Sequence, residues 1–248
     1  MLTEQGIKRY IKSDIDIIFL EESPSTNLEA KSIAATAREG TVIFARRQLS
    51  GRGRIGRSFE SPEGGIYMTM LVRPTDPVCL TMAAAVAVRR AMVDKLNLDP
   101  AIKWVNDIYW EGKKVCGILA EGALCKNELR YAAVGVGLNY QSPVFTGGLS
   151  AKAGSLYPDS QPPVSIDEMA AAMADQLYKA LTNPSDPSIY REYRASSMLT
   201  GKREGEPEAT AIDVTPEGHL IVRFDDGCTE ELYSGEVSVR AAEYPHTV

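Results

Sequence analysis

The segment 51–57, with the sequence GRGRIGR, constrains the fold of this chain more than any other feature. It interleaves three glycines with three arginines, and Arg46 and Arg47 add two more guanidinium groups just upstream. Guanidinium groups this close together cannot be buried without partners. The glycines favour a backbone that bends instead of continuing as a helix or strand. Because the arginine fork matches carboxylate and phosphate oxygens, we expect a surface loop that closes on an anion.

Composition places this loop in an otherwise acidic protein. The chain has 248 residues, 44% of them hydrophobic and 24% charged, and its net charge is −6. That length and composition are typical of a globular protein with one large domain, or one large and one small. Proteins that bind nucleic acid non-specifically are usually basic. We therefore expect a local anion site and no nucleic-acid partner.

The chain shows no targeting or membrane signal. Its N-terminus lacks an apolar signal core, and no apolar run reaches membrane-spanning length. The cysteines show no CxxC pair, so we expect reduced, packed thiols in a cytoplasmic protein; they are Cys79, Cys116, Cys125 and Cys228. The two histidines, His219 and His246, both lie in the C-terminal part, which argues against a multi-histidine metal site.

Apolar patterning predicts mixed α and β structure over most of the chain. Strands are expected at residues 15–20, 41–45, 66–72, 102–105 and 129–138, with a hairpin of 107–110 and 115–121. Helices are expected at residues 28–38, 78–96, 165–181 and 189–198. Capping boxes are predicted at Thr26 with Glu29 and at Ser165 with Glu168. Residues 141–163, rich in proline, glycine and serine, are expected to form a loop.

The character of the sequence changes near residue 199. A charged, glycine-rich stretch is followed by short strand patterns with tight turns at 209–214, 219–224, 228–233 and 237–240. This pattern predicts a small β-barrel, which would be too short to be stable alone. We expect a large domain over residues 1–199 and a barrel over 200–248 that packs against it.

Four motifs, in chain order, resemble those of the biotin protein ligases. The first is Ser25-Thr26-Asn27 with Gln48 and the GRGRIGR segment. The others are KWVND at 103–107 with KKVCGIL at 113–119, GLN at 137–139, and GEVSVR at 235–240. The resemblance implies an α+β fold, with a mixed sheet packed against helices and a C-terminal SH3-like barrel.

The resemblance has two departures and one consequence for DNA binding. Val105 stands where the family usually has proline, and Phe59 where it often has tryptophan. Phe59 keeps an aromatic face that could cover a ligand. Some family members carry an N-terminal helix-turn-helix domain. Here the first strand is expected by about Ile15, so we expect no operator binding.

The resemblance implies a two-step reaction. Biotin is first activated by ATP, giving biotinyl-5′-adenylate and pyrophosphate, and is then transferred to a lysine of a biotin carboxyl carrier protein. The first step brings together two anions, which at about 4 Å and an effective dielectric of about 20 repel by roughly 4 kcal/mol. Arginines of the loop would offset this repulsion, and Mg²⁺ would screen the phosphates. We expect the loop 46–59 to be mobile without ligand and ordered around the adenylate.

The resemblance also assigns residues to the ligands. Biotin is assigned to Ser25, Thr26, Asn27, Gln48, Arg52, Gly53, Arg54, Lys114 and Gly117. ATP is assigned to Arg54, Arg57, Phe59, Lys103, Asn106, Asn139 and Arg240. Catalytic roles fall to Lys114, Arg54, Arg52 and Asp107, and Asp107 is also the candidate metal ligand.

Other functions fit parts of this pattern. A lipoate–protein ligase would share the fold and chemistry, a module that binds nucleic-acid phosphates would explain the arginine loop, and an inactive scaffold would hold biotin without turnover. Individually, Ser25 and Thr26 would be helix caps, and Asn106-Asp107 a turn. The joint occurrence of the motifs favours the biotin ligase, and Lys114 with Arg54 argues against an inactive scaffold. Family members associate through sheet edges, so a homodimer is possible.

Overall fold

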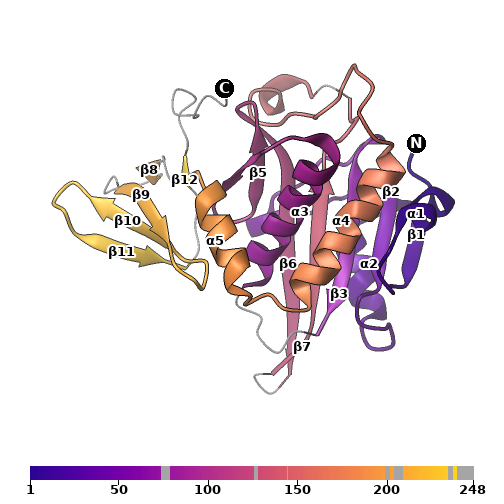
Figure 1. Ribbon diagram of the computed structural model, residues 1–248, viewed down its shortest axis with the longest axis horizontal. Helices are drawn as coiled ribbons and strands as arrows, with labels where there is room; N and C mark the ends of the chain where they lie inside the picture. Colours follow the sequence, from indigo (N-terminus) through magenta and orange to yellow (C-terminus); the bar gives the residue numbers. More distant parts are fainter. Residues whose placement is uncertain are drawn as a thin grey trace.

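A mixed seven-stranded sheet forms the centre of the protein in the computed structural model (Figure 1). The structure describes residues 1–73, 79–125, 128–143, 145–198, 202–203, 209–233 and 237–238. Across the sheet the strands are β1 (Ile17–Ser23), β2 (Val42–Gln48), β3 (Ile66–Val72), β7 (Glu128–Leu138), β6 (Lys113–Cys125), β5 (Asp107–Trp110) and β4 (Ala101–Lys103). β1 and β2 are parallel, and the other neighbours are antiparallel. The predicted mixed sheet is confirmed.

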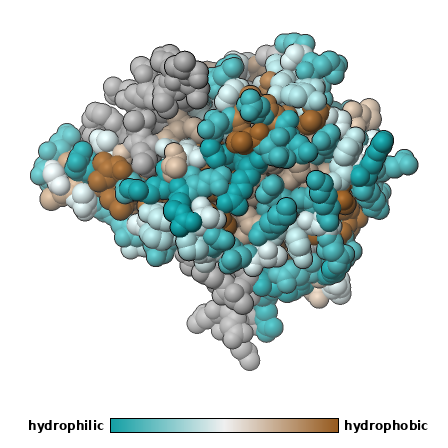
Figure 2. Space-filling view, in the orientation of Figure 1, coloured by the Kyte–Doolittle hydropathy of each residue, from teal (hydrophilic) through white to brown (hydrophobic). Residues whose placement is uncertain are grey.

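Helices cover both faces of this sheet. On one face lie α3 (Leu80–Leu96) and α4 (Ile166–Leu181), with α1 (Glu4–Tyr10) against α4 and α5 (Pro187–Ser196) against α3 (Figure 1). The opposite face is covered by α2 (Thr26–Ile33). The side that carries α3 to α5 presents a largely hydrophilic surface (Figure 2). The predicted packing of helices on a mixed sheet is thus confirmed.

The apolar sequence of β3 follows from its position between these layers. All its residues are buried, because one face of the strand meets α4 and the other meets α2. A strand covered on both faces lacks the polar alternation of a half-exposed one. On the α2 side, Ala30 and Ala34 pack on Ile43 and Leu71. The small alanine side chains let the helix lie close to the sheet.

The predicted capping box at the start of α2 is wrong. The helix begins at Thr26 with Ser25 as its N-cap, and the Ser25 side chain makes no capping hydrogen bond. Glu29 instead accepts a hydrogen bond of 3.1 Å from the Ser23 hydroxyl. The Ser25 hydroxyl is therefore left for another role. The helix ends at Ile33, five residues before the predicted end at Arg38.

The second predicted capping box is half correct. Ser165 caps α4 by accepting a hydrogen bond of 3.2 Å from the backbone N–H of Glu168. The Glu168 carboxylate does not reach back to the cap, because it pairs with Lys95 of α3 at 3.2 Å. The N-terminal helix α1 was not predicted. It is held from outside its own sequence, since Asp167 accepts a hydrogen bond of 2.8 Å from the backbone N–H of Thr3.

The C-terminal strands form a separate antiparallel sheet in the order β11-β10-β9-β8-β12, beyond α5 (Figure 1). Their bounds are β8 (Lys202–Arg203), β9 (Ala209–Val214), β10 (Leu220–Phe224), β11 (Thr229–Leu232) and β12 (Val237–Ser238). α5 holds this sheet through the ion pair of Arg194 with Asp213, at 2.5 and 2.7 Å. The predicted boundary at residues 199–200 lies outside the described residues. Division into two domains and closure of the barrel stay predictions.

Cys79, Cys116 and Cys228 are free thiols, and the side chain of Cys125 lies outside what the structure describes. Cys79 and Cys116 are buried, as expected, and burial raises the pKa of Cys116 well above its ordinary value. Cys228 is exposed, contrary to the expectation of packing, because it follows a tight turn in which its N–H donates to Asp226. No helix within the described ranges has both the length and the apolar character needed to cross a membrane.

Candidate functional site

A cavity of about 500 Å³ opens between the arginine loop and strands β5, β6 and β7. This volume lies in the range of small-molecule sites. Its lining includes every residue assigned to biotin from the sequence, together with Arg57, Phe59, Lys103, Asn106 and Asp107. Asn139 is not among the lining residues, and Arg240 lies outside the described residues. The fold therefore gathers motif residues as far apart in the chain as Ser25 and Gly137 into one space.

The charge of this lining is strongly one-sided. Six cationic side chains line the cavity: Arg52, Arg54, Arg57, Lys103, Lys114 and Lys152. Asp107 is the sole carboxylate among its described lining residues. A concave surface with such a balance attracts polyanions. Lys152 was missed from the sequence, because it lies in the segment 141–163, where no motif or periodicity marks it.

The first wall of the cavity is a network of hydroxyls and amides. The Gln48 side-chain oxygen accepts a hydrogen bond of 2.9 Å from the backbone N–H of Thr26, and its amide nitrogen donates to the Ser61 hydroxyl at 2.8 Å. These two bonds fix the orientation of the amide. The Ser25 side chain is buried beside them and lines the cavity. Since this hydroxyl caps nothing, it is available to a ligand.

Thr69 and Glu121 support this wall, and neither was predicted. The fully buried Thr69 hydroxyl lies 2.8 Å from the Thr26 hydroxyl and 2.7 Å from the Asn27 side-chain oxygen. The Asn27 amide nitrogen donates to Glu121 at 2.9 Å. Asn27 therefore lines the cavity with its polar atoms already bonded to the sheet. Thr69 belongs to the apolar pattern of β3, so no sequence signal distinguished it from core.

Glu121 connects this wall to the arginine loop. Its carboxylate lies 2.6 Å from the Lys31 ammonium group and 3.7 Å from the Arg52 guanidinium. Burial by itself would raise the pKa of Glu121, but hydrogen bonds from Lys31 and Asn27 outweigh it and hold that pKa below its ordinary value. The carboxylate therefore stays ionised and attracts Arg52 to this side of the cavity.

The arginine loop is an irregular hairpin between β2 and β3. It is closed by backbone hydrogen bonds from Gln48 to Ser61, from Phe59 to Gly51 and from Gly53 to Arg57. At its tip Ile55 has φ 53° and is 77% exposed. A β-branched residue is strained in this left-handed region. The expected ordering of the loop by ligand stays a prediction.

Phe59 lies over the glycines that form the cavity floor. A Cβ atom built on Gly137 would lie 2.6 Å from the Phe59 ring, and one built on Gly117 would lie 3.1 Å from it. The Lys114 ammonium nitrogen lies 5.8 Å from the centre of the same ring. Bare backbone on β6 and β7 therefore lets an aromatic ring rest directly on the sheet.

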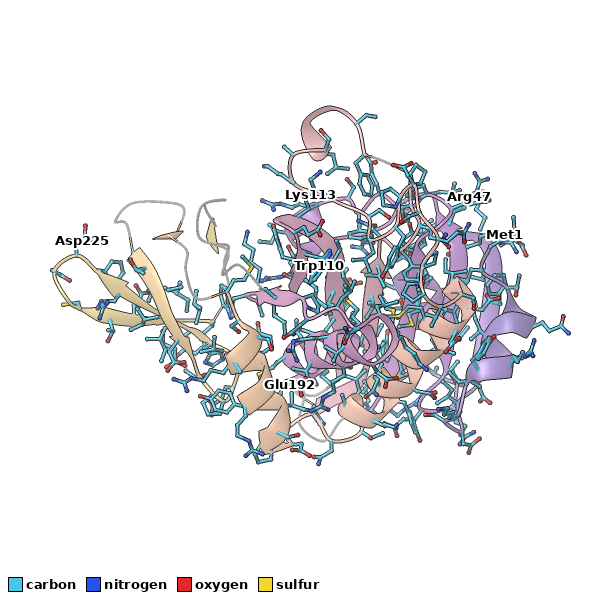
Figure 3. The ribbon with its side chains drawn as sticks, turned by 45° about the horizontal axis from the view of Figure 1, so that its top comes forward. Met1, Arg47, Trp110, Lys113, Glu192 and Asp225 are labelled. Carbon is cyan, nitrogen blue, oxygen red and sulfur yellow. The ribbon has the colours of Figure 1, made fainter. Side chains whose placement is uncertain are left out.

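Lys114 and Asp107 form the charged centre of the opposite wall. Lys114 Nζ lies 2.7 Å from Asp107 Oδ1. The backbone of Lys114 is fixed as well, because its N–H donates to Lys152 and its carbonyl accepts from Gly154, both at 2.9 Å. The loop 149–154 is thus joined to the start of β6, beyond the β5–β6 turn marked by Trp110 and Lys113 (Figure 3).

Asn106 faces the arginine loop from this wall. Its amide nitrogen donates to the Ile118 carbonyl at 2.8 Å, which leaves its side-chain oxygen to accept from Arg54 at 3.4 Å. The sequence predicted Asn106 and Arg54 to share a ligand, and the structure places them together. Asn139 is instead buried below the wall, where its amide nitrogen donates to the Gly154 carbonyl at 3.0 Å. It therefore supports the loop 149–154.

The described residues contain no cluster of three or more His, Cys, Asp or Glu side chains suited to a metal ion. Asp107 by itself fits a magnesium ion that arrives with a nucleotide, because Mg²⁺ takes one or two carboxylates and fills its other positions with phosphate oxygens and water. The residues present are thus compatible with Mg²⁺ bound to a substrate phosphate.

A second cavity of about 220 Å³ adjoins the first and shares Arg54, Ile118 and Leu119 with it. Its outer wall comes from the C-terminal sheet, through residues that include His219 and Tyr233. The described part of that sheet therefore lies next to the wall that carries Arg54.

Comparison with known proteins gives consistent results. The profile of the biotin/lipoate A/B protein ligase family matches residues 17–139. The bifunctional ligase/repressor BirA of Bacillus subtilis is 35% identical over 96% of this chain and 79% of its own length. The biotin–[acetyl-CoA-carboxylase] ligase of Paracoccus denitrificans is 33% identical over 82% of this chain and 87% of its own length.

A solved structure gives the same relationship in three dimensions. The biotin protein ligase from Aquifex aeolicus in complex with biotin and ATP superposes with a TM-score of 0.77 at 26% identity, over 91% of this chain and 98% of that one.

Proposed function

Because the chain belongs to the biotin/lipoate A/B protein ligase family, we propose that the 500 Å³ cavity is its centre for activating biotin with ATP. The protein is a biotin protein ligase, an ATP-dependent enzyme. One observation carries the assignment of its site. The cavity unites all the residues assigned to biotin with most of those assigned to ATP, and it combines a single described carboxylate with six cationic side chains.

The polar wall is suited to the ureido edge of biotin. That edge presents two N–H donors and a carbonyl acceptor, so it needs partners of both kinds. The buried Ser25 hydroxyl is available to it, whereas the Gln48 amide is held by Thr26 and Ser61. The Gln48 amide therefore meets a ligand in a single fixed orientation. The Phe59 ring, which lies on the glycine floor, offers an apolar surface for the body of biotin between this wall and Lys114.

The cationic side chains address the first chemical step. A biotin carboxylate oxygen attacks the α-phosphorus of ATP, a new C–O–P linkage forms, and the bond to the leaving pyrophosphate breaks. Lys114 and Arg54 stabilise the negative charge that gathers on the phosphate oxygens. Asp107 holds the Lys114 ammonium in place, and Asn106 does the same for Arg54. Asp107 is the described residue that would hold a Mg²⁺ ion arriving with ATP, and that ion would screen the phosphate charge.

The second step transfers biotin to the acceptor. The lysine amine attacks the acyl carbon, the bond to AMP breaks, and the amine loses a proton. The acceptor is the biotin carboxyl carrier protein of a carboxylase, as the names of the relatives imply. The arginine loop would cover the adenylate and exclude water until the acceptor arrives. The proposal has three further parts. The protein forms a homodimer through a sheet edge, the C-terminal strands close into an SH3-like barrel, and Arg240 contributes to the ATP site.

Lipoate is the alternative acid, since the family includes lipoate ligases as well as biotin ligases. The experiment that tests the proposal incubates the protein with MgATP, a purified biotin carboxyl carrier domain, and either biotin or lipoate. Avidin blotting and mass spectrometry of the carrier read the product, and a carrier with its target lysine changed to arginine is the control. The proposal expects biotin on the native carrier alone. Attachment of lipoate but not biotin would overturn it.

A further inference from the structure

The segment 103–107 carries three of the side chains assigned to the site, yet it is short of regular structure. Only its two end residues belong to strands: Lys103 ends β4, and Asp107 begins β5. Between them the chain turns at Trp104, Val105 and Asn106. Strand β6 holds the end of this segment, through Ile118 and Gly117, and the turn at Trp104 and Val105 needs supports of its own.

Helix α5 supplies one support from behind the cavity. The hydroxyl of Tyr193, a fully buried side chain, donates a hydrogen bond of 3.2 Å to the Val105 carbonyl. Burial raises the pKa of this phenol well above its ordinary value, so the hydroxyl keeps its proton and remains a donor. Tyr193 lies close to the cavity yet is not among its lining residues.

α5 itself is firmly placed. Glu192, labelled in Figure 3, pairs with Arg89 at 2.9 Å and with Arg90 at 2.8 Å, both on α3. α3 belongs to the main core, where most of its side chains are buried. The residue before Tyr193 is thus tied to a largely buried helix, which holds α5 in place for the contact with Val105.

The C-terminal sheet supplies a second support. The Trp104 indole N–H donates a hydrogen bond of 2.8 Å to the Gly218 carbonyl, and the Trp104 side chain is only 4% exposed. Gly218 lies in the turn before β10 with φ 85°, a conformation that favours glycine. The carbonyl that receives the indole is therefore set by a turn that few other residues would form.

We propose that Tyr193 and Trp104 are positioning residues that fix the segment 103–107, and through it Asn106 and Asp107, for the reaction of ATP. The inference rests on the proposed function of the cavity. Tyr193 does not line the cavity; Trp104 lines it, with its indole N–H bonded to Gly218 on the far side. Tyr193 holds the Val105 backbone, Trp104 ties the same turn to the small sheet, and Asn106 and Asp107 then meet Arg54 and Lys114 in one arrangement.

The test compares Tyr193→Phe with Tyr140→Phe in biotin-dependent exchange of pyrophosphate into ATP. Tyr140 is an exact chemical match, since it is fully buried and its hydroxyl donates to the Val164 carbonyl at 2.7 Å, away from the cavity lining. Each variant loses one buried hydroxyl and one hydrogen bond. A purely structural role would thus affect both alike. Thermal unfolding of both variants is measured alongside the kinetics.

We expect Tyr193→Phe to lower kcat/KM for ATP by about tenfold or more, because small displacements of catalytic groups are costly. KM for biotin should stay unchanged, since the polar wall is not involved, and Tyr140→Phe should resemble the wild type in both. Equal kinetics of the two variants would overturn the inference. Absence of exchange in the wild type would instead overturn the proposed function.

A second pair covers the case in which Tyr193→Phe does not fold. Trp104→Phe removes the indole N–H that binds Gly218, whereas Trp110→Phe changes the other tryptophan, at the β5–β6 turn. The same selective loss of kcat/KM for ATP is expected in Trp104→Phe. Equal exchange kinetics in these two variants would overturn the inference.

Discussion

Lys114 Nζ lies 2.7 Å from Asp107 Oδ1, and this pair sets the charged centre of the cavity. The two residues lie on neighbouring strands, β6 and β5, so the hairpin between them fixes their separation. Each has a second function in the proposed mechanism, Lys114 toward the phosphate oxygens on which charge gathers and Asp107 toward Mg²⁺. Their pairing therefore keeps Lys114 oriented before substrates bind.

Asp107→Asn should weaken the pairing at this centre. The amide keeps the size of the side chain and an acceptor oxygen but loses the negative charge, so it holds the Lys114 ammonium group less tightly. We expect adenylate formation to fall by about 10²-fold, since displacement of a catalytic group can cost that much. Pyrophosphate exchange at saturating biotin measures it. Full activity in Asp107→Asn would show that Lys114 does not depend on this partner.

Thr69→Val should weaken biotin binding. Valine matches threonine in shape but cannot bond to the Thr26 hydroxyl or to the Asn27 side-chain oxygen. The Thr26 hydroxyl keeps its bond to Gln48, whereas the buried Asn27 oxygen loses its Thr69 partner. An unpaired buried polar group costs about 1–3 kcal/mol. We expect reduced stability and a raised KM for biotin with KM for ATP unchanged. The control is Thr36→Val, at an exposed position. An unchanged KM for biotin in Thr69→Val would contradict the role given to the hydrogen-bond network.

Gly135→Ala should disturb the polar wall of the cavity, because the added methyl group would clash with Asn27. A Cβ at this position would overlap the Asn27 side-chain oxygen, so Asn27 and the start of α2 would have to move. Overpacking of this kind costs about 1–3 kcal/mol. Gly148→Ala is the matched control, because a Cβ there meets no atom within 4 Å. Chemical denaturation should show a loss in Gly135→Ala alone, and equal stability of the two variants would refute the close approach.

Much of the fold could be predicted from the sequence, because its signals are local. The apolar run of β3, the long alanine-rich α3 and the β5–β6 hairpin each carry their own pattern. The sequence did not reveal α1, which depends on a bond from Thr3 to Asp167. The sequence also predicted the wrong partner for the Glu29 carboxylate. That carboxylate accepts a hydrogen bond from Ser23, which lies six residues earlier, at the end of β1.

The candidate site, too, could be predicted from the sequence only in part. Motif residues such as Ser25, Gln48 and Lys114 could be located, since their identity and order are visible in the chain. Thr69 and Glu121 could not, because each resembles an ordinary strand residue until the fold brings its partners together. Lys152 lies in a loop whose path is set by backbone bonds to Lys114.

Glu121→Gln should alter the pH dependence of stability. The pKa of Glu121 is lowered in the folded protein, so its ionised form stabilises the fold at pH values above its ordinary pKa of 4.5. That contribution is lost as the pH falls through the lowered folded-state pKa. Wild type should therefore exceed Glu121→Gln in unfolding free energy near neutral pH, and the difference should shrink below pH 4.5. A difference independent of pH would contradict the assignment.

The most direct test of the central claim is biotin-dependent exchange of labelled pyrophosphate into ATP by the wild type, Arg54→Ala and Lys114→Ala. The account predicts exchange with biotin and not with lipoate. It also predicts a loss of about 10²–10³-fold in each variant, the cost typical of removing one group that stabilises transition-state charge. Exchange by the folded variants at the wild-type rate, or none by the folded wild type with biotin, would contradict the claim that this cavity activates biotin.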